Sequence, residues 1–532
     1  MLVEDGDGDG LADLVETPGH IGTNSSKWDT DDDGLNDGDE IVKKTNPLDP
    51  DTDRDGVMDS EDIDPLHDLL VTVKISRIKI LDPVDYGVDW ESIPIPYPVV
   101  KECWDKSHFP WYVPHYHTTI EYYYMEVPVY QPVKYAEPAF EVKMSDQWDS
   151  GHWVHSDPRP LATGVEDYYF TAEFPMNVPD DDPTVDIKIA AWDWDLSTDL
   201  PEVAEEVLAE LLRLDSFEPD MLDIESQSGK ILDITYYLDD YNGHRQGTWS
   251  GDTTNEVSSG LAGIIYKRAL IEFSVKTEYE LPYEEQMRLA EEYSPILYFH
   301  EDEEWFPRDI NDFLEDAALI DKRRTDDPVD EQPVSIDSLA EYYTEDYYLD
   351  WDGYSIINYG LKVYSHVFTA YNHKIVIQYW FFYLNDVGSV NWHEGDWEMI
   401  QLILPEKDLA YSYHYSVKNS SWKTDVYEGD HPIVYVEKGG HANLFSGDKD
   451  IRYNADDYNT TDADGYYTIE ILSGQEWLAF RGNWGAWFSG LVAYSGPPGP
   501  VFRYSADILG ITPFAYMWTD PIFWAAHPTL TV

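Results

Sequence analysis

The chain has 532 residues, with 105 Asp and Glu against 34 Lys and Arg, and a formal net charge of −71. This charge argues against a protein that grips nucleic acid or anionic lipid through clustered basic side chains, and it favours divalent cations as partners. The hydrophobic fraction of 42% and the aromatic fraction of 15% exclude a disordered acidic chain. At roughly 100–200 residues per domain, the length predicts about three folded domains.

Cysteine use and hydropathy exclude two further classes. A single cysteine, Cys103, excludes an internal disulfide framework and a cysteine-based zinc site. The densest apolar stretch, Ile375 to Leu384, is about half as long as a membrane span, so no transmembrane segment is expected. Residues 1–4 do not form a signal peptide. Either the protein stays inside the cell, or a leader was removed.

An acidic repeat of the form D-x-D-x-D-G-x-x-D-x-x-E occurs three times in the first 66 residues. Carboxylates at positions 1, 3, 5, 9 and 12 and the carbonyl of position 7 surround one point, which suits calcium, and the glycine at position 6 permits a sharp turn. The third copy has Asp in place of Glu at position 12. The predicted calcium ligands are Asp5, Asp7, Asp9, Leu11, Asp13, Glu16, Asp29, Asp31, Asp33, Leu35, Asp37, Glu40, Asp51, Asp53, Asp55, Val57, Asp59 and Asp62.

A solvated acidic linker is the alternative interpretation of this segment, but charge repulsion alone would not select one register three times. No amphipathic helices of EF-hand length flank the repeats, and the short linkers carry Pro47 and Pro50. Residues 1–66 therefore resemble thrombospondin type 3 repeats. That resemblance implies a fold wound around several calcium ions, with little apolar core, in a protein that lies outside the cell.

Residues 70–277 are predicted to be mostly strands, which we expect at 71–80, 118–130, 184–194, 231–238 and 269–275. One helix is expected from Pro201 to Leu212. Acidic residues follow two of the strands, and short clusters on neighbouring loops could share calcium. With the run Ala191–Asp195, this region loosely resembles a C2-type β-sandwich. Plain acidic turns are the alternative. The candidate ligands are Asp82, Asp85, Asp193, Asp195 and Asp199.

Residues 281–532 form a third predicted domain. Helices are expected at 282–293 and 310–319, and strands at 362–370, 374–384, 397–404, 410–415 and 432–437. The fold class expected for the whole chain is therefore mainly β and multidomain: a calcium-wound head, a C2-like β-sandwich, and a carboxy-terminal β-sandwich with peripheral helices.

The chemistry of this third domain gathers around the segment Trp392–Glu398. Asp396 and Glu398 are two apart on a strand and share a face, and a bulge at Gly395 would bring His393 round to them. Asp386 lies at the same rim if the two strands form a hairpin. This set suits Mg²⁺, Ca²⁺, Mn²⁺ or Zn²⁺ without a strong preference. His441, which follows a glycine pair, and His414 are further candidates for ligand contact, although a core position is the more usual one for His414.

Several motifs in this domain resemble the Vps62-related family over residues 285–527: residues 291–312, His393–Glu398, Gly440–Asn443, Gly482–Gly485 and Ser495–Pro500. The H-x-x-D-W-E core is also similar to the heptapeptide of necrosis-inducing (NLP) proteins. That likeness implies that Asp386, His393, Asp396 and Glu398 hold a metal that helps to bind a glycolipid headgroup. Trp392 stands where the toxin motif has Gly, and Gly395 stands where it has its second His, which argues against toxin activity.

The expected function is that of an extracellular or cell-surface protein that binds several calcium ions. Its carboxy-terminal domain is expected to use Mg²⁺ or Ca²⁺ to bind a partner, either a glycan or another surface protein; a structural surface subunit is the version without a ligand. The alternative is a metal-dependent hydrolase with Glu394 or His441 as general base. The chain has no G-x-S-x-G, H-E-x-x-H or phosphate-loop motif, so an enzyme is the less favoured hypothesis.

Overall fold

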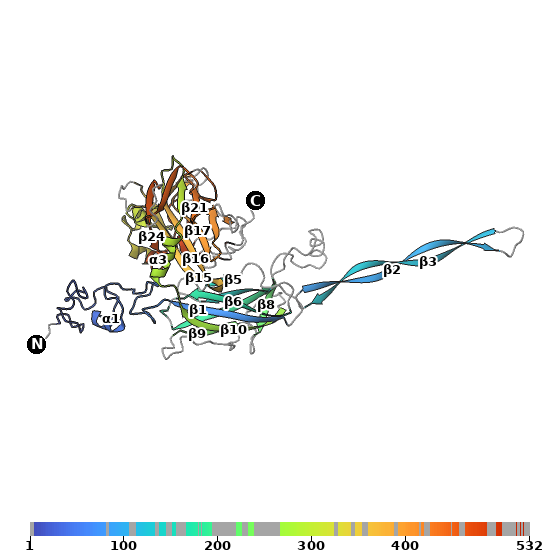
Figure 1. Ribbon diagram of the computed structural model, residues 1–532, viewed down its shortest axis with the longest axis horizontal. Helices are drawn as coiled ribbons and strands as arrows, with labels where there is room; N and C mark the ends of the chain where they lie inside the picture. Colours follow the sequence, from blue (N-terminus) through green and yellow to red (C-terminus); the bar gives the residue numbers. More distant parts are fainter. Residues whose placement is uncertain are drawn as a thin grey trace.

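The structure is a computed structural model. It describes residues 5–80, 85–105, 113–133, 138–144, 152–155, 166–178, 180–181, 183–193, 220–225, 232–238, 267–323, 328–341, 346–353, 360–387, 392–413, 416–419, 426–447, 449–456, 463–486, 496–502, 518, 522 and 525. Figure 1 shows an amino-terminal head (residues 5–66) at one end of a middle domain, with a carboxy-terminal domain packed on one side of that middle domain. The expected mainly β, multidomain class is confirmed.

The head consists of turns and one short helix, α1 (Asp37–Lys43), whose amino end is capped by the side chain of Asn36. Apart from Pro47, Val57 is the only aliphatic or aromatic residue buried among its described residues. Several carboxylates are buried instead: Asp9, Glu16, Asp33, Asp37, Glu40 and Asp59. A segment of this kind cannot be held together by the hydrophobic effect, because it removes almost no apolar surface from water.

The middle domain contains an eight-stranded sheet in the order β5-β4-β7-β8-β10-β1-β6, with β9 paired to β7. The pairing is antiparallel except between β8 and β10. Its strands are β1 (Leu69–Ile80), β4 (Pro138–Met144), β5 (His152–His155), β6 (Asp167–Asn177), β7 (Thr184–Asp193), β8 (Asp220–Glu225), β9 (Leu232–Tyr237) and β10 (Lys267–Tyr279). The predicted helix at 201–212 and the side chain of Cys103 lie outside what the structure describes.

Strand β1 shows how the sequence builds this sheet. Leu69, Val71, Val73 and Ile75 alternate toward the core, and then the register shifts between Ile75 and Arg77. This bulge changes the parity of the strand, so Ile78 and Ile80 are still buried. The expected strand therefore forms over its full length, although its hydrophobic alternation is regular only in the first half.

A long β-ribbon leaves the middle domain at the end opposite the head (Figure 1). It consists of β2 (Asp85–Asp105) and β3 (Val113–Val133), which pair only with each other among the described strands. The strand expected at 118–130 belongs to this ribbon and not to the eight-stranded sheet. Strand β2 carries prolines at alternate positions, Pro94, Pro96 and Pro98. A proline has no N–H, so these residues fit only where the backbone nitrogen faces away from the partner strand.

The carboxy-terminal domain is built on an eleven-stranded sheet in the order β19-β18-β17-β16-β15-β24-β23-β11-β21-β20, with β22 paired to β21. Its strands are β11 (Ile296–Phe299), β15 (Lys362–Ala370), β16 (Lys374–Val387), β17 (Trp392–Leu404), β18 (Asp408–Tyr413), β19 (Ser416–Asn419), β20 (Tyr427–Glu428), β21 (His431–Val436), β22 (Asn443–Leu444), β23 (Ile451–Ala455) and β24 (Gly465–Ile471). Strand β16 is largely apolar from Ile375 to Leu384 because both of its faces are covered: Trp380 and Phe382 face one core, and Tyr379 and Phe381 face another.

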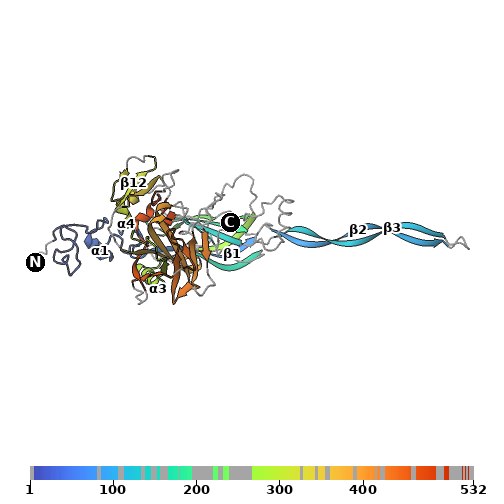
Figure 2. The same ribbon diagram turned by 90° about the horizontal axis from the view of Figure 1, so that it is seen from above.

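A smaller sheet, β13-β12-β14, lies at the edge of this domain (Figure 2). Its strands are β12 (Ala317–Asp321), β13 (Pro328–Asp330) and β14 (Tyr347–Trp351), and the helices are α3 (Tyr283–Glu292), α4 (Ile310–Leu314), α5 (Ile336–Glu341) and the 3₁₀ turns η1 (Tyr371–His373), η3 (Glu476–Ala479) and η4 (Pro500–Phe502). The helix expected at 310–319 is wrong in its second half. It ends at Leu314, because β12 pairs with β14 and buries Ala317 and Leu319.

Aromatic residues fill much of the core of this domain. Trp380, Trp397 and Trp484 are among the largest fully buried side chains, and the rings of Trp397 and Trp484 meet edge to face at 5.5 Å. Over the part of the chain that the structure describes, no helix has the length and apolar character needed to cross a membrane.

The middle and carboxy-terminal domains meet at Glu280, which follows β10. The hydroxyl of Thr369 in β15 donates to its carboxylate at 2.5 Å, and both side chains are buried.

We expect Thr369→Val to lower the free energy of unfolding by about 1–3 kcal/mol, because the buried carboxylate of Glu280 loses a hydrogen-bond donor. Urea unfolding of the full chain measures this. Thr468→Val, at an exposed position of β24, is the control and should change stability by less than about 0.5 kcal/mol. Equal effects would contradict the prediction.

Candidate metal centres

Each acidic loop of the head is shaped by hydrogen bonds from its own backbone. In the second loop, the carboxylate of Asp29 accepts from the N–H groups of Asp32 at 2.7 Å and Gly34 at 2.9 Å, and Asp33 accepts from Leu35 at 2.6 Å. The third loop repeats these bonds at Asp51 and Asp55. Both carboxylate oxygens of Asp29 and of Asp51 accept in these turns, whereas Asp33 uses one oxygen and its other oxygen has no hydrogen-bond partner.

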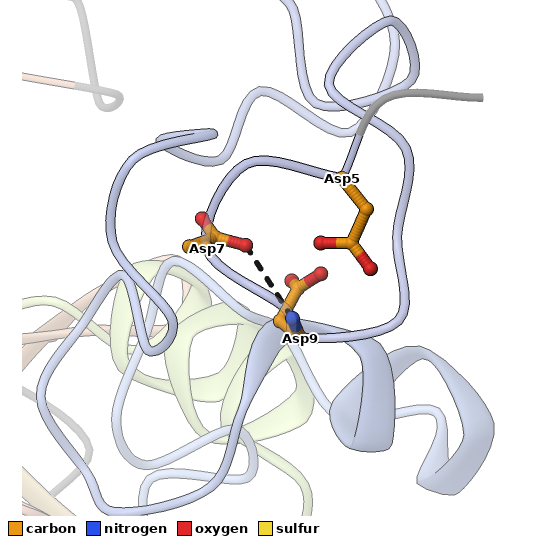
Figure 3. A group of neighbouring side chains, drawn as sticks. All are labelled: Asp5, Asp7 and Asp9. Carbon is orange, nitrogen blue, oxygen red and sulfur yellow. Dashed lines mark hydrogen bonds between the residues drawn. The ribbon is translucent and has the colours of Figure 1, made fainter. Parts of the chain in front are cut away.

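The carboxylates at positions 1, 3 and 5 converge in all three loops. One oxygen from each lies within 4.8 Å of the others in the groups Asp5–Asp7–Asp9, Asp29–Asp31–Asp33 and Asp51–Asp53–Asp55. Figure 3 shows the first group, in which the three side chains turn into the same loop. The spacing predicted from sequence therefore brings these nine residues together in the predicted sets.

Many oxygens in these groups are buried and have no hydrogen-bond partner. In the first two loops they come from positions 3, 5 and 12, and in the third from positions 3 and 12: Asp7, Asp9, Glu16, Asp31, Asp33, Glu40, Asp53 and Asp62. An unsatisfied buried carboxylate oxygen is costly, because it has lost water and gained no donor. A cation at the centre of each loop would remove that cost.

Burial and mutual repulsion also shift the ionisation of these groups. Burial, followed by the charges of neighbouring carboxylates, raises the pKa of Asp31 to about 6, of Glu40 to about 8 and of Asp53 to about 9. Both effects disfavour the charged form, and a bound divalent cation acts in the opposite direction.

The carboxylate of position 9 links one loop to the one before it. Asp37 accepts from the N–H and the hydroxyl of Thr30, both at 2.7 Å, and it lies within 4.8 Å of Asp9 and Glu16 in the first loop. Thr52 donates to Asp59 in the same way. Burial and the charges of carboxylates in its own loop are the larger causes of the raised pKa of Glu40, and the charge of Asp59 adds to them. The sequence repeat assigns each position 9 to its own loop and gives no sign of this crossing.

A ligand candidate outside the head was also missed. Asp180, between β6 and β7, lies within 4.8 Å of Asp55 and Asp62 of the third loop. Burial, followed by the charges of Asp55 and Asp62, raises its pKa to about 11. The local signal was the acidic run 180–182 after a strand, but nothing in the sequence related it to a loop more than a hundred residues earlier.

The candidate calcium site between loops of the middle domain stays a prediction. Asp82, Asp195 and Asp199 lie outside the described residues. Asp85 begins β2 and Asp193 ends β7, and the structure describes their backbone alone.

In the carboxy-terminal domain, the structure forms two acid–imidazole pairs. Asp386 and His393 are opposite each other on β16 and β17, with Asp386 Oδ2 3.4 Å from His393 Nε2. Asp396 Oδ2 lies 3.1 Å from Nδ1 of His441. All four side chains are buried. The predicted hairpin between the two strands is confirmed, and it places Asp386 beside His393.

The imidazole of the second pair, His441, is enclosed by other side chains. Its side chain is completely buried, its ring stacks on Tyr383 at 3.9 Å between centroids, and its Nε2 has no hydrogen-bond partner, the nearest carboxylate oxygen being that of Glu303 at 4.0 Å. Burial, followed by the charges of Asp396, Glu398 and Glu303, raises the pKa of the Tyr383 hydroxyl. Two of these carboxylates, Asp396 and Glu303, also approach the His441 ring.

Gly395 turns the chain between these groups. Its φ is +55°, and a Cβ there would lie 2.3 Å from the carbonyl oxygen of Trp484. Glu394, on one side of it, accepts from the N–H groups of Trp351 at 2.9 Å and Ala486 at 3.1 Å, whereas Asp396, on the other side, contacts His441. Regular alternation would put both acids on one face. The strand register does not shift at Gly395, so the bulge predicted to bring His393 round to Asp396 and Glu398 does not form, and His393 lies opposite Asp386 instead.

The predicted set Asp386, His393, Asp396 and Glu398 does not form one tight cluster. Among the residues that the structure describes, every group of three acid or imidazole side chains with ligand atoms within 4.8 Å lies in the head or at its junction with Asp180. Glu394, the candidate base, is held by backbone N–H groups away from His441. His414 lies outside the described residues.

Comparisons with known proteins give little support of their own. No family model matches the chain, and no curated protein matches it. A solved structure of NLPPya in complex with mannosamine is similar at 16% identity and a TM-score of 0.21, over 36% of this chain and 78% of that one. A likeness this weak carries no argument, so the resemblances to thrombospondin type 3 repeats, C2 domains, the Vps62-related family and NLP proteins stay predictions.

Two variants can separate the effect of the close contact between Gly395 and Trp484 from the effect of the positive φ of Gly395. We expect Gly395→Ala to destabilise the protein by about 1–3 kcal/mol more than Gly429→Ala, because its methyl group would overlap Trp484. Gly429 also has a positive φ, +66°, but nothing lies within 4 Å of the point that a Cβ would occupy there, so that substitution carries conformational strain alone. Chemical unfolding of both variants tests this, and similar losses would show that the contact is unimportant.

Proposed function

We propose that this chain is an extracellular or cell-surface protein whose head binds calcium and whose carboxy-terminal domain binds a partner with the help of a divalent metal. One observation carries the calcium assignment: three successive loops each turn buried, unpartnered carboxylate oxygens toward a common centre. An acidic linker exposed to solvent would turn the same side chains outward, because repulsion drives like charges apart.

The ligand chemistry of the loops favours calcium over other common ions. The side chains that converge in the loops offer oxygen alone, which disfavours zinc and copper. Calcium accepts six to eight oxygens in flexible geometry, whereas magnesium demands a near-ideal octahedron and keeps its waters. Calcium loops suit a location where the ion is abundant, and this supports the extracellular assignment.

For the carboxy-terminal site we favour binding over catalysis, because the chain has no G-x-S-x-G, H-E-x-x-H or phosphate-loop motif. Asp396 and Glu303 approach the two nitrogens of His441, and Glu398 follows Asp396 on β17; such oxygen and nitrogen atoms suit Mg²⁺ or Ca²⁺. We take glycans as the ligand class because their hydroxyl groups can complete the coordination of such an ion. Another surface protein is the second kind of partner.

A metal-dependent hydrolase is the competing function, and one observation favours it. Asp396 contacts Nδ1 of His441 and leaves Nε2 without a partner, which is the arrangement of an oriented general base. Metal-dependent hydrolysis of a chromogenic ester that disappears in His441→Gln would decide for the enzyme.

Calcium removal tests the head directly. When the free calcium concentration is 100 times the dissociation constant of a site, binding at that site adds about 2.7 kcal/mol to the free energy of unfolding. The wild-type Tm should therefore rise in calcium and fall in EDTA. Asp31→Asn should lose one ion of the wild-type count by native mass spectrometry, because it removes a charged ligand from the second loop.

The control is Asp32→Asn in the same loop. Its side chain is 79% exposed and pairs with Lys27, so the calcium count should not change. A wild-type Tm that does not respond to calcium or to EDTA would refute calcium binding by the head.

The carboxy-terminal site has a separate test. Asp396→Asn should remove one metal equivalent from the full chain and abolish metal-dependent retention on a glycan array, while the calcium count of the head is unchanged. Glu406→Gln, a half-exposed carboxylate of the same domain, serves as the control. Metal content that is the same in Asp396→Asn and in the wild type would exclude Asp396 as a ligand.

A further inference from the structure

The acidic loops of the head are completed by residues that follow them in the chain. Asp9 and Glu16, at positions 5 and 12 of the first loop, lie within 4.8 Å of Asp37, at position 9 of the second. The second loop meets the third in a similar way: the Ser60 hydroxyl donates to the carbonyl of Asp33 at 2.6 Å, beside Asp59. The third loop has no acidic loop after it in the head.

Asp180 stands at the third loop where Asp37 stands at the first. Its carboxylate lies within 4.8 Å of Asp55 and Asp62, which again are positions 5 and 12. It comes from the connection between β6 and β7 of the middle domain, and its carbonyl accepts from the N–H of Ile63 at 3.3 Å. The same three-carboxylate arrangement therefore recurs, with one member supplied by another domain.

The Asp180 side chain is buried without a partner. Its exposed fraction is 0%, and neither of its carboxylate oxygens has a hydrogen-bond partner. Among the described residues, no lysine, arginine or histidine forms an ion pair with Asp55, Asp62 or Asp180. Asp37 differs in this respect, because Thr30 donates to both of its oxygens. Three acids buried together, without a basic partner, require a cation or the loss of their charges.

We propose that Asp180 is a ligand of the third calcium site, so that one Ca²⁺ is shared between the head and the middle domain. This inference rests on the proposed binding of calcium by the head. It also accounts for Asp62, which is shorter than the Glu at position 12 of the other loops: the second domain supplies the carboxylate that the third loop would otherwise lack. Calcium at this site joins the two domains as well as ordering the loop.

The test compares Asp180→Asn with Asp181→Asn in the full chain. The first keeps the shape of the side chain and removes its charge; the second changes the exposed neighbour. Calcium content is measured by equilibrium dialysis and elemental analysis, and the junction around residues 60–70 is probed by hydrogen exchange in calcium and in EDTA. We expect Asp180→Asn to weaken one calcium site at least tenfold and to leave the junction as exchangeable in calcium as in EDTA. Asp181→Asn should behave as the wild type.

Asp31→Asn separates this proposal from calcium binding in general. It should lose an ion from the second loop and keep a calcium-protected junction. In EDTA, Asp180→Asn should melt no lower than the wild type, because it replaces a buried acid that has no basic partner by a neutral side chain of the same shape, and this excludes simple misfolding as the cause of its calcium defect. Unchanged calcium affinity and unchanged protection in Asp180→Asn would overturn the proposal. A wild type that binds no calcium would instead overturn the proposed function of the head.

Discussion

Repulsion among buried carboxylates is the constraint on which the amino-terminal head of the molecule depends. The head buries Asp9, Glu16, Asp33, Asp37, Glu40 and Asp59, and hardly any apolar side chain. In an ordinary domain, the hydrophobic effect offsets the conformational entropy that is lost on folding. Here that contribution is almost missing, and electrostatics opposes compaction. Under the proposed function, bound divalent cations would reverse the sign of the electrostatic contribution and would stabilise the head in place of an apolar core.

The other two domains follow the opposite physical rule. Their sheets are stabilised by apolar faces, and the strands with the strongest apolar patterns, such as β15 and β16, form where the sequence predicts them. The predictions were wrong where the secondary structure of a segment depends on pairing with residues that are distant in the sequence. The second half of the expected helix at 310–319 pairs with a strand some thirty residues later. Likewise, nothing in the 118–130 segment tells a ribbon strand from a sheet strand, because both alternate.

The candidate sites divide in the same way. Within each acidic loop, ligand geometry depends on the spacing of a few neighbouring residues, so sequence alone predicted that positions 1, 3 and 5 converge. The crossing of Asp37 to the first loop and the approach of Asp180 to the third depend on how loops and domains pack, which no local pattern encodes. At the carboxy-terminal site, sequence identified Asp396 and His441 separately, and their contact appears only when β21 and β17 are in one sheet.

The prolines of the long ribbon have a consequence for how molecules of this protein meet one another. Strands of 21 residues extend about 70 Å, and a two-stranded ribbon normally offers two edges to which a further strand can add. Along the middle of β2, however, the outward backbone nitrogens belong to Pro94, Pro96 and Pro98. An incoming strand would find carbonyl acceptors there and no donors. The arm can therefore be long and exposed without acting as a template for β-aggregation along that stretch.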